Sequence, residues 1–478
     1  MPDPSAQSTV AVAGGGLAGL AAACALADAG FRVTLFEKRP FLGGRASSYE
    51  HPGTGEVVDN CQHVLFRVCT NLVEFYQRIG VDQKIRWYDE MTFLEPGGRA
   101  TVMRASPLPA PLHTAPSFLR FPFLTAADKL AITRALVPLT LTTQRDNVQS
   151  FQQWLRQHGQ TQGAVERFWK PILVSALSED LDLISVSAAA QVVRESMKSP
   201  AARHMGVPTV PLTELYNAAG DYIRARGGDL RLRRSLETFQ PESSRVRVQL
   251  GDRPGESPGS KEEAFDYLVL ALPFDGLEKI LPQVPESAPL RDMLSHFETA
   301  PITGIHLWFD RQISDLDHAV LLDRTIQWMF HKSRLQPIRA EAANGAVGGS
   351  YIELVVSSSK SLIEMSRADI VDLALREVRE FFPAARAATL VKSTVIKEIH
   401  ATYSPRPGID AYRPPASTNW PRVFLAGDWT ATGWPATMEG AVRSGYLAAE
   451  ALTRAAGRKD RRFLVPDLHA SGFMRWFS

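Results

Sequence analysis

A strand, a glycine-rich turn, a helix and a second strand open this chain, and this unit restricts the fold more than any other feature. Residues 10–13 are a short apolar run, and residues 14–19 read GGGLAG. A helix of small residues is predicted from Leu20 to about Ala29, and residues 31–36 are rich in β-branched and aromatic side chains. Such a βαβ unit favours an α/β fold with a parallel sheet.

The spacing of the glycines in this turn has a mechanical explanation. Gly14 permits the sharp turn, Gly16 lets the backbone approach a pyrophosphate, and Gly19 allows the helix to pack closely on the strand. The helix N-terminus adds its positive dipole and free N–H groups. Glu37 ends the second strand, where its carboxylate can accept hydrogen bonds from ribose hydroxyls. The unit therefore predicts a dinucleotide site, but it leaves NAD and FAD both open.

Two later stretches favour FAD. Gly44 and Arg45 follow shortly after Glu37, and Gly427 and Asp428 follow the last apolar strand. The extended ribityl chain of FAD needs contacts well beyond the first turn, and an arginine near the pyrophosphate and a carboxylate near the ribityl hydroxyls would supply them. A plain strand-ending turn is the alternative interpretation of Gly427 and Asp428.

The chain of 478 residues is longer than one hydrophobic core usually supports, so two domains are expected. Dinucleotide-fold signals occur at its start, middle and end. We expect a Rossmann-like FAD-binding domain built from discontinuous segments, residues 1–85, 205–275 and 395–457. A substrate domain with a mixed sheet and a helical insertion is expected from residues 86–204 and 276–394, with the helical part near 106–204. Residues 458–478 are expected to form a C-terminal tail.

Local composition predicts the remaining elements. Strands are expected in residues 87–102 (a hairpin), 230–248, 265–273, 304–309, 326–331, 351–356 and 423–426. Helices are expected in residues 369–381 and 439–455, and a polar loop in residues 251–263.

The composition restricts the partners and the location of the protein. A net charge of +2 gives no reason to expect a nucleic acid, and three cysteines fit neither a disulfide framework nor a zinc site. A cytoplasmic location is expected. Residues 108–124 are apolar and broken by prolines, so they line a channel, dip into lipid on the inner face of the membrane, or cap the core of the helical part. Any membrane contact is expected to be peripheral, because no apolar run is long enough to span a bilayer.

The motifs at both ends of the chain resemble those of the flavin-containing amine oxidases and the carotenoid desaturases. They are residues 14–19, Glu37-Lys38, residues 43–45, and the C-terminal Gly427-Asp428 and Met438-Glu439. The resemblance implies that Gly16, Leu17 and Ala18 meet the pyrophosphate and Glu37 the adenosine ribose. It also implies that Leu236 holds the adenine and that Met438 and Glu439 lie beside the isoalloxazine.

Four other stretches narrow the resemblance to one branch. Residues 57–65, 86–88, 93–98 and 105–112 resemble the squalene-associated FAD-dependent desaturases, which act as hydroxysqualene dehydroxylases in hopanoid synthesis. Thr437 stands where amine oxidases commonly carry an aromatic residue, and no cysteine follows Cys69 to attach a flavin. Non-covalent FAD and a non-amine substrate are therefore expected.

The reaction that this resemblance implies is a reduction, in which hydride from reduced flavin replaces the allylic hydroxyl of hydroxysqualene to give squalene. An electron donor or reductase is then a required partner. His63 is the candidate for the catalytic acid, because histidine titrates near neutrality. The alternative for His63 is a hydrogen bond to the flavin or backbone. Asp59 is expected to be structural or to contact the flavin, and Glu439 to contact the ring or cap a helix.

Other functions stay open at this point. A carotenoid desaturase would use the same cofactor and channel, but it would remove hydride from a polyene and pass electrons to a quinone or oxygen. An amine oxidase is disfavoured by Thr437. A non-catalytic scaffold would have no need of the cofactor motifs.

Overall fold

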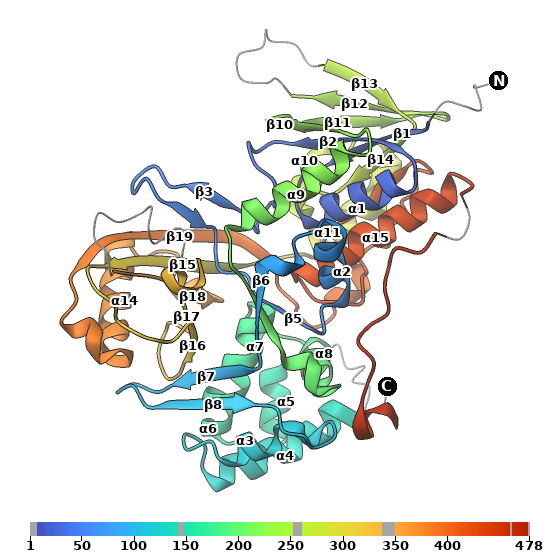
Figure 1. The fold of residues 1–478 in the computed structure, drawn as a ribbon. Helices are drawn as coiled ribbons and strands as arrows, with labels where there is room; N and C mark the ends of the chain where they lie inside the picture. The colour runs from blue at the N-terminus through green and yellow to red at the C-terminus, as the bar shows by residue number, and fades with distance from the viewer. Residues whose placement is uncertain (1–6, 142–147, 252–260, 337–348, 459–460, 477–478) are drawn as a thin grey trace.

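The computed structural model describes residues 7–141, 148–251, 261–336, 349–458 and 461–476. Its fold is mixed α/β, as predicted (Figure 1). A five-stranded sheet lies in the upper part of Figure 1, and all of its pairings are parallel. Its order is β10 (Asp229–Leu232), β2 (Arg32–Glu37), β1 (Thr9–Ala13), β14 (Tyr267–Leu270) and β20 (Val423–Leu425).

The helix that follows β1 is buried along almost its whole length. This helix, α1 (Leu17–Asp28), begins directly after Gly16, three residues earlier than predicted. Small side chains let it pack closely between the sheet and α15 (Met438–Ala455), and a Cβ on Gly445 of α15 would lie 2.3 Å from the carbonyl oxygen of Ala18. Helices α2 (Thr70–Arg78) and α9 (Leu212–Arg224) contribute to the same core.

A seven-stranded mixed sheet forms the second large layer. Its order is β19 (Leu390–Tyr403), β15 (Thr299–Phe309), β18 (Ser350–Ser357), β17 (Trp328–His331), β16 (His318–Leu321), β7 (Glu90–Leu94) and β8 (Ala100–Arg104). Among the described strands of this sheet, only β16 and β7 pair in parallel. Helix α14 (Arg367–Phe381) packs on one face of the sheet through apolar side chains such as Ile370 and Val378.

A helical layer packs on the other face of this sheet, below it in Figure 1. It contains α3 (Ala115–Leu119), α4 (Ala126–Leu141), α5 (Phe151–Gln157), α6 (Gln162–Ala164), α7 (Lys170–Leu177) and α8 (Val186–Met197). Its aromatic and aliphatic side chains meet Phe93, Val320 and Phe330 of the sheet. The chain after α15 descends to this layer, where Phe473 N donates a hydrogen bond to Ala110 O.

Smaller elements complete the fold. The pair β3 (Ser48–Glu50) and β4 (Val57–Asp59), the sheet of β5 (Leu65–Phe66), β9 (Met205–Pro208) and β6 (Ile85–Tyr88), and the sheet of β11 (Leu236–Pro241), β12 (Val246–Leu250) and β13 (Lys261–Phe265) are antiparallel. The short helices are α10 (Phe274–Ile280), α11 (Ala288–Ser295) and α12 (Lys332–Leu335).

Residues 252–260 of the expected polar loop lie outside the described residues, and residues 261–263 belong to β13 instead of the loop. The assignment of residue ranges to two domains stays a prediction. Within the described residues, no helix has both the length and the apolar character needed to cross a bilayer.

Candidate cofactor and substrate site

One cavity of about 970 Å³ joins the parallel sheet to the helical layer. Its first part lies at the carboxyl ends of β1, β2, β14 and β20, where open α/β sheets bind their ligands. Nearly all residues singled out from the sequence line it, namely Gly14, Gly16, Leu17, Ala18, Glu37, Lys38, Gly44, Arg45, His63, Leu236, Gly427, Asp428, Met438 and Glu439. Gly19 does not line the cavity but packs beneath it, where a Cβ would lie 1.9 Å from Gly14 O.

The glycine turn fits a pyrophosphate. Gly14 has φ +113° and a Cβ there would lie 2.3 Å from Ala271 O, so only glycine is tolerated. A Cβ on Gly16 would meet only Gly44 Cα, at 3.9 Å, so the backbone is open toward the cavity. Gly16 is also the N-cap of α1 and has no side chain to cap it. The helix N-terminus therefore keeps its positive dipole for an anionic ligand.

Glu37 ties the turn to the next segment. Its Oε2 accepts from Gly15 N at 2.7 Å and its Oε1 accepts from Arg39 N at 2.7 Å. Each carboxylate oxygen has two lone pairs, so the group can still accept hydrogen bonds from ribose hydroxyls. Arg39 Nη1 in turn donates to Gly44 O at 2.9 Å, which joins the two glycine turns.

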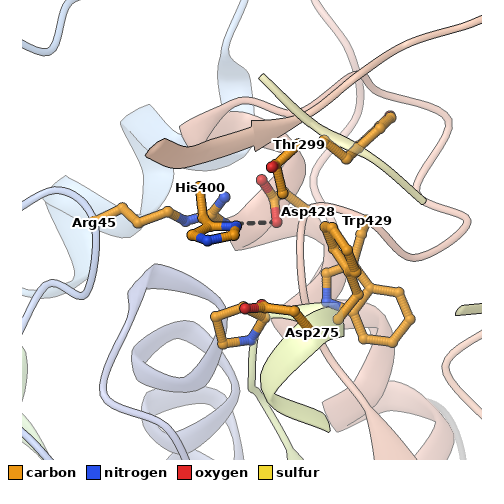
Figure 2. A pocket seen from close by; sticks show the side chains of 9 residues that line it. Arg45, Asp275, Thr299, His400, Asp428 and Trp429 are labelled. Atoms are coloured by element: carbon orange, nitrogen blue, oxygen red, sulfur yellow. Dashed lines mark hydrogen bonds and ion pairs between the residues drawn. The ribbon is translucent and has the colours of Figure 1, made fainter. Parts of the chain in front are cut away.

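Arg45 and Asp428, expected to bind different parts of FAD, contact each other directly. Arg45 Nη2 lies 2.7 Å from Asp428 Oδ1, and Arg45 Nη1 donates to Ala401 O at 2.7 Å. Figure 2 shows the pair, with His400 and Trp429 nearby. Burial disfavours the charged form of Arg45, but the carboxylate of Asp428 favours it more strongly, so the pKa of the guanidinium is raised. Sequence analysis missed this pair because 383 positions separate its members.

Glu439, for which capping of its own helix was one expected role, does not cap the N-terminus of α15. Thr437 caps this helix, since its Oγ1 accepts from Gly440 N at 3.0 Å. Glu439, fully buried, caps α2 instead, because its oxygens accept from Leu72 N at 2.7 Å and from Asn71 Nδ2 at 3.0 Å. Burial raises the pKa of Glu439. Glu439 therefore fixes α2 against the cofactor end of the cavity.

His63 lines the cavity as a neutral imidazole. Its Nδ1 donates to Cys61 O at 2.7 Å, and since a carbonyl can only accept, this nitrogen carries the proton. Burial lowers the pKa of His63 below its ordinary value of 6.5, and the bond to Cys61 only partly opposes this effect. At neutral pH Nε2 therefore carries a lone pair, which suits a proton acceptor better than the proton donor we expected.

A buried ionic cluster holds the segment that carries His63. Lys332 Nζ lies 2.5 Å from Asp59 Oδ2, 2.7 Å from Gln62 Oε1 and 3.4 Å from Glu353 Oε2. Lys332 and Glu353 are fully buried. Burial raises the pKa of Glu353 to about 7, although Lys332 opposes the shift. Asp59 is thus structural, one of the two roles expected for it. No sequence signal pointed to Lys332 or Glu353, because Lys332 directly follows one predicted apolar strand and Glu353 lies within another.

The far part of the cavity is apolar and reaches the surface. Aromatic side chains of the helical layer and of the seven-stranded sheet line it, including Phe118, Trp169 and Trp328. Leu112 and Val137 line the cavity and are also exposed, so the cavity opens beside α3 and α4. The segment 108–124 therefore contributes both to a channel wall and to an exposed apolar face.

Comparison with known proteins gives relatives along nearly the whole chain. The chain is 28% identical over 482 residues to a 15-cis-phytoene desaturase of Synechococcus elongatus, covering 97% of this chain and 99% of that protein. It is also 28% identical to a probable zeta-carotene desaturase of the same organism, covering 93% and 98%.

Solved structures share the fold at low identity. An oxidoreductase from Methanosarcina mazei has a TM-score of 0.67 at 15% identity and covers 91% of this chain and 98% of its own. Cyclohexylamine oxidase from Brevibacterium oxydans has a TM-score of 0.64 at 16% identity, covering 95% and 100%.

The expected reduction of hydroxysqualene, and with it a place in squalene and hopanoid synthesis, is wrong. The relatives that overturn it are phytoene and zeta-carotene desaturases. The stretch 57–65 that suggested the squalene branch contributes cavity wall near His63, and an apolar cavity wall does not reveal the direction of electron flow.

The family match and the geometry of the site identify the family and the cofactor. The model of the flavin-containing amine oxidoreductases matches residues 17–453, which include helix α1, Glu37, Arg45 and Asp428. The glycine turn, the free helix N-terminus and the carboxylate of Glu37 fit FAD, which is the cofactor of this protein. The chain belongs to the family of flavin-containing amine oxidoreductases.

Proposed function

We propose that this protein is an FAD-dependent desaturase of a long, apolar isoprenoid of the phytoene type. The observation that carries the proposal is the continuous cavity that joins the glycine turn before α1 to an apolar chamber lined by aromatic side chains. The names of the relatives at 28% identity support the same substrate class.

Desaturation removes two hydrogens from adjacent carbons and leaves a C=C bond. Bound FAD supplies the capacity for two-electron oxidation, so one hydrogen leaves with its electron pair and the other leaves as a proton. An electron acceptor, a quinone or oxygen, therefore replaces the electron donor that we first expected. The apolar walls exclude water, and the lone pair on His63 Nε2 receives the proton.

We further propose that Arg45 and Asp428 hold the phosphate and ribityl parts of FAD and that Leu236 borders its adenine. The flavin is held without a covalent bond. Cys61 and Cys69 line the cavity, but burial raises the pKa of both thiols well above the ordinary value, so neither is a ready nucleophile.

The test is an anaerobic half-reaction. Purified, FAD-saturated protein is mixed with phytoene in detergent, and flavin absorbance and polyene products are followed together. We expect bleaching of the oxidised flavin, coupled to formation of a more conjugated polyene. Bleaching by amines, with none from phytoene, would refute the proposal.

The opening of the cavity suggests how such a substrate enters. Leu112, Val137 and Leu141 line the cavity and are exposed. Neighbouring segments add four more exposed apolar side chains, which gives the seven residues Leu112, Leu119, Leu130, Val137, Leu141, Phe473 and Trp476. Lys129 Nζ donates to Leu119 O at 2.8 Å, which joins α3 to α4, and η9 (Gly472–Trp476) is bonded to Ala110. We refer to these seven residues as the apolar rim.

The charges around the apolar rim favour an anionic lipid surface as its partner. Arg120, Arg134 and Arg475 are exposed there. Asp128, the one acidic residue in 106–141, is buried and bonded to Thr125 and Thr161. Each basic residue near an anionic bilayer contributes about 1 kcal/mol. We propose that the apolar rim sits in the interface of a bilayer, from which the substrate enters the cavity.

The double substitution Leu119→Glu/Trp476→Glu should lower binding to anionic vesicles by at least about 10-fold, because it removes apolar contact and adds negative charge. Co-sedimentation with phosphatidylglycerol vesicles at low and high salt measures this effect. Val391→Glu, on the exposed surface of β19, is the matched control and should leave binding unchanged. Equal loss in both variants would contradict the assignment of the apolar rim.

A further inference from the structure

We propose that Arg203 is a polar anchor inside the cavity, which binds a hydrogen-bond-accepting oxygen carried by an otherwise apolar ligand. Arg203 ends the short helix η4 (Pro200–Arg203), between α8 and β9, and lines the cavity. Met103 and Phe118 line the same chamber. The inference rests on the proposed function in treating this chamber as an isoprenoid site.

The guanidinium of Arg203 lacks a strong acceptor. Its Nη2 lies 2.8 Å from Met103 Sδ, and a thioether is only a weak acceptor. Among the described residues no carboxylate forms an ion pair with it. Glu195, which also lines the cavity, is paired with Lys198 at 3.1 Å.

The remaining donors of Arg203 are available to a ligand. Arginine carries five N–H donors, and Arg203 is only partly buried because it lines the cavity. Burial lowers the pKa of Arg203 to about 10, so the side chain remains charged at neutral pH. A ligand that brings an oxygen to this position gains a charge-assisted hydrogen bond at little cost to the protein.

The surroundings define the class of ligand. The chamber is lined mainly by aromatic and aliphatic side chains, so most of the ligand must be hydrocarbon. The expected ligand therefore has a prenyl or alkyl chain that carries a carbonyl or hydroxyl oxygen. Two kinds of compound fit this description: a quinone that accepts electrons, through its carbonyl, and an isoprenoid alcohol, through its hydroxyl.

The test is equilibrium binding to the oxidised, FAD-saturated protein, followed by the change in flavin absorbance. The probes are decylubiquinone, geranylgeraniol and squalene, which has no oxygen. In Arg203→Met, which retains side-chain length but removes all donors, we expect about 10- to 100-fold weaker binding of an oxygen-bearing probe. Squalene should bind within about 2-fold of wild type. Arg156→Met, on the exposed face of α5, is the matched control.

The outcomes separate the sources. A loss limited to decylubiquinone identifies an acceptor site, and a loss limited to geranylgeraniol identifies a contact with the isoprenoid. Equal loss for all three probes, or no loss for either oxygen-bearing probe, overturns the proposal. The thermal midpoint of unfolding provides a second measure, since removal of a charge that lines the cavity without an ion-pair partner should not lower it, whereas removal of a packing residue should. Binding is measured without turnover, so failure of desaturation would refute the proposed function alone.

Discussion

Replacing His63 by asparagine should slow flavin reduction by phytoene by about 100- to 10,000-fold while FAD stays bound. The reason is the lone pair on Nε2, which asparagine cannot supply at a comparable basicity. Anaerobic stopped-flow measurement of flavin absorbance gives the rate, and the visible spectrum of the purified variant gives FAD content. His296→Asn, on an exposed histidine stacked on Tyr412, is the matched control and should be close to wild type.

The pH dependence adds a second readout. Burial lowers the pKa of His63 from its ordinary value of 6.5, so the base stays neutral at and above that pH. The wild-type rate should therefore be flat from pH 8 to 6.5 and fall only at lower pH, as the imidazole takes up a proton. A variant that loses FAD instead of rate would show that His63 holds the cofactor, which was the alternative role considered for it.

The cofactor end of the site could be predicted from sequence because its determinants are local. The turn at Gly14 and Gly16, the helix after it and Glu37 lie within one βαβ unit, and each has a steric or electrostatic reason for its position. The cofactor residues expected near the C-terminus, Gly427 and Asp428, also follow a recognisable strand. The mixed α/β fold followed from the same periodic signals.

Contacts between distant segments could not be predicted in this way. Glu439 caps α2, which is 367 positions away, and Arg45 pairs with Asp428 across the cavity. Such contacts depend on how the layers pack, and they cannot be inferred from the local pattern of a single sequence. The expected direction of electron flow was overturned by the names of the relatives, since an apolar cavity wall serves oxidation and reduction alike.

The ionic cluster of Lys332, Asp59 and Glu353 could not be predicted from the sequence, and its effect on stability should be large. Substitution of Lys332 by methionine should lower the free energy of unfolding by about 3–5 kcal/mol, because it leaves Asp59 buried without its cation. Denaturant unfolding of the FAD-saturated protein measures the change. Lys84→Met breaks the exposed pair with Glu214 and, as the matched control, should cost at most about 1 kcal/mol.

The penalty for losing Lys332 should also increase with pH, for a reason specific to Glu353. Burial raises the pKa of Glu353 to about 7, so its contribution to stability is fully present below its ordinary pKa of 4.5 and is lost as pH rises through 7. Lys332 opposes this shift, so without it the pKa of Glu353 rises further and stability keeps falling above pH 7. Adding Glu353→Gln to Lys332→Met should remove that part of the pH dependence. If Lys332→Met costs no more than Lys84→Met at both pH 6 and pH 8, the cluster does not hold the segment that carries His63.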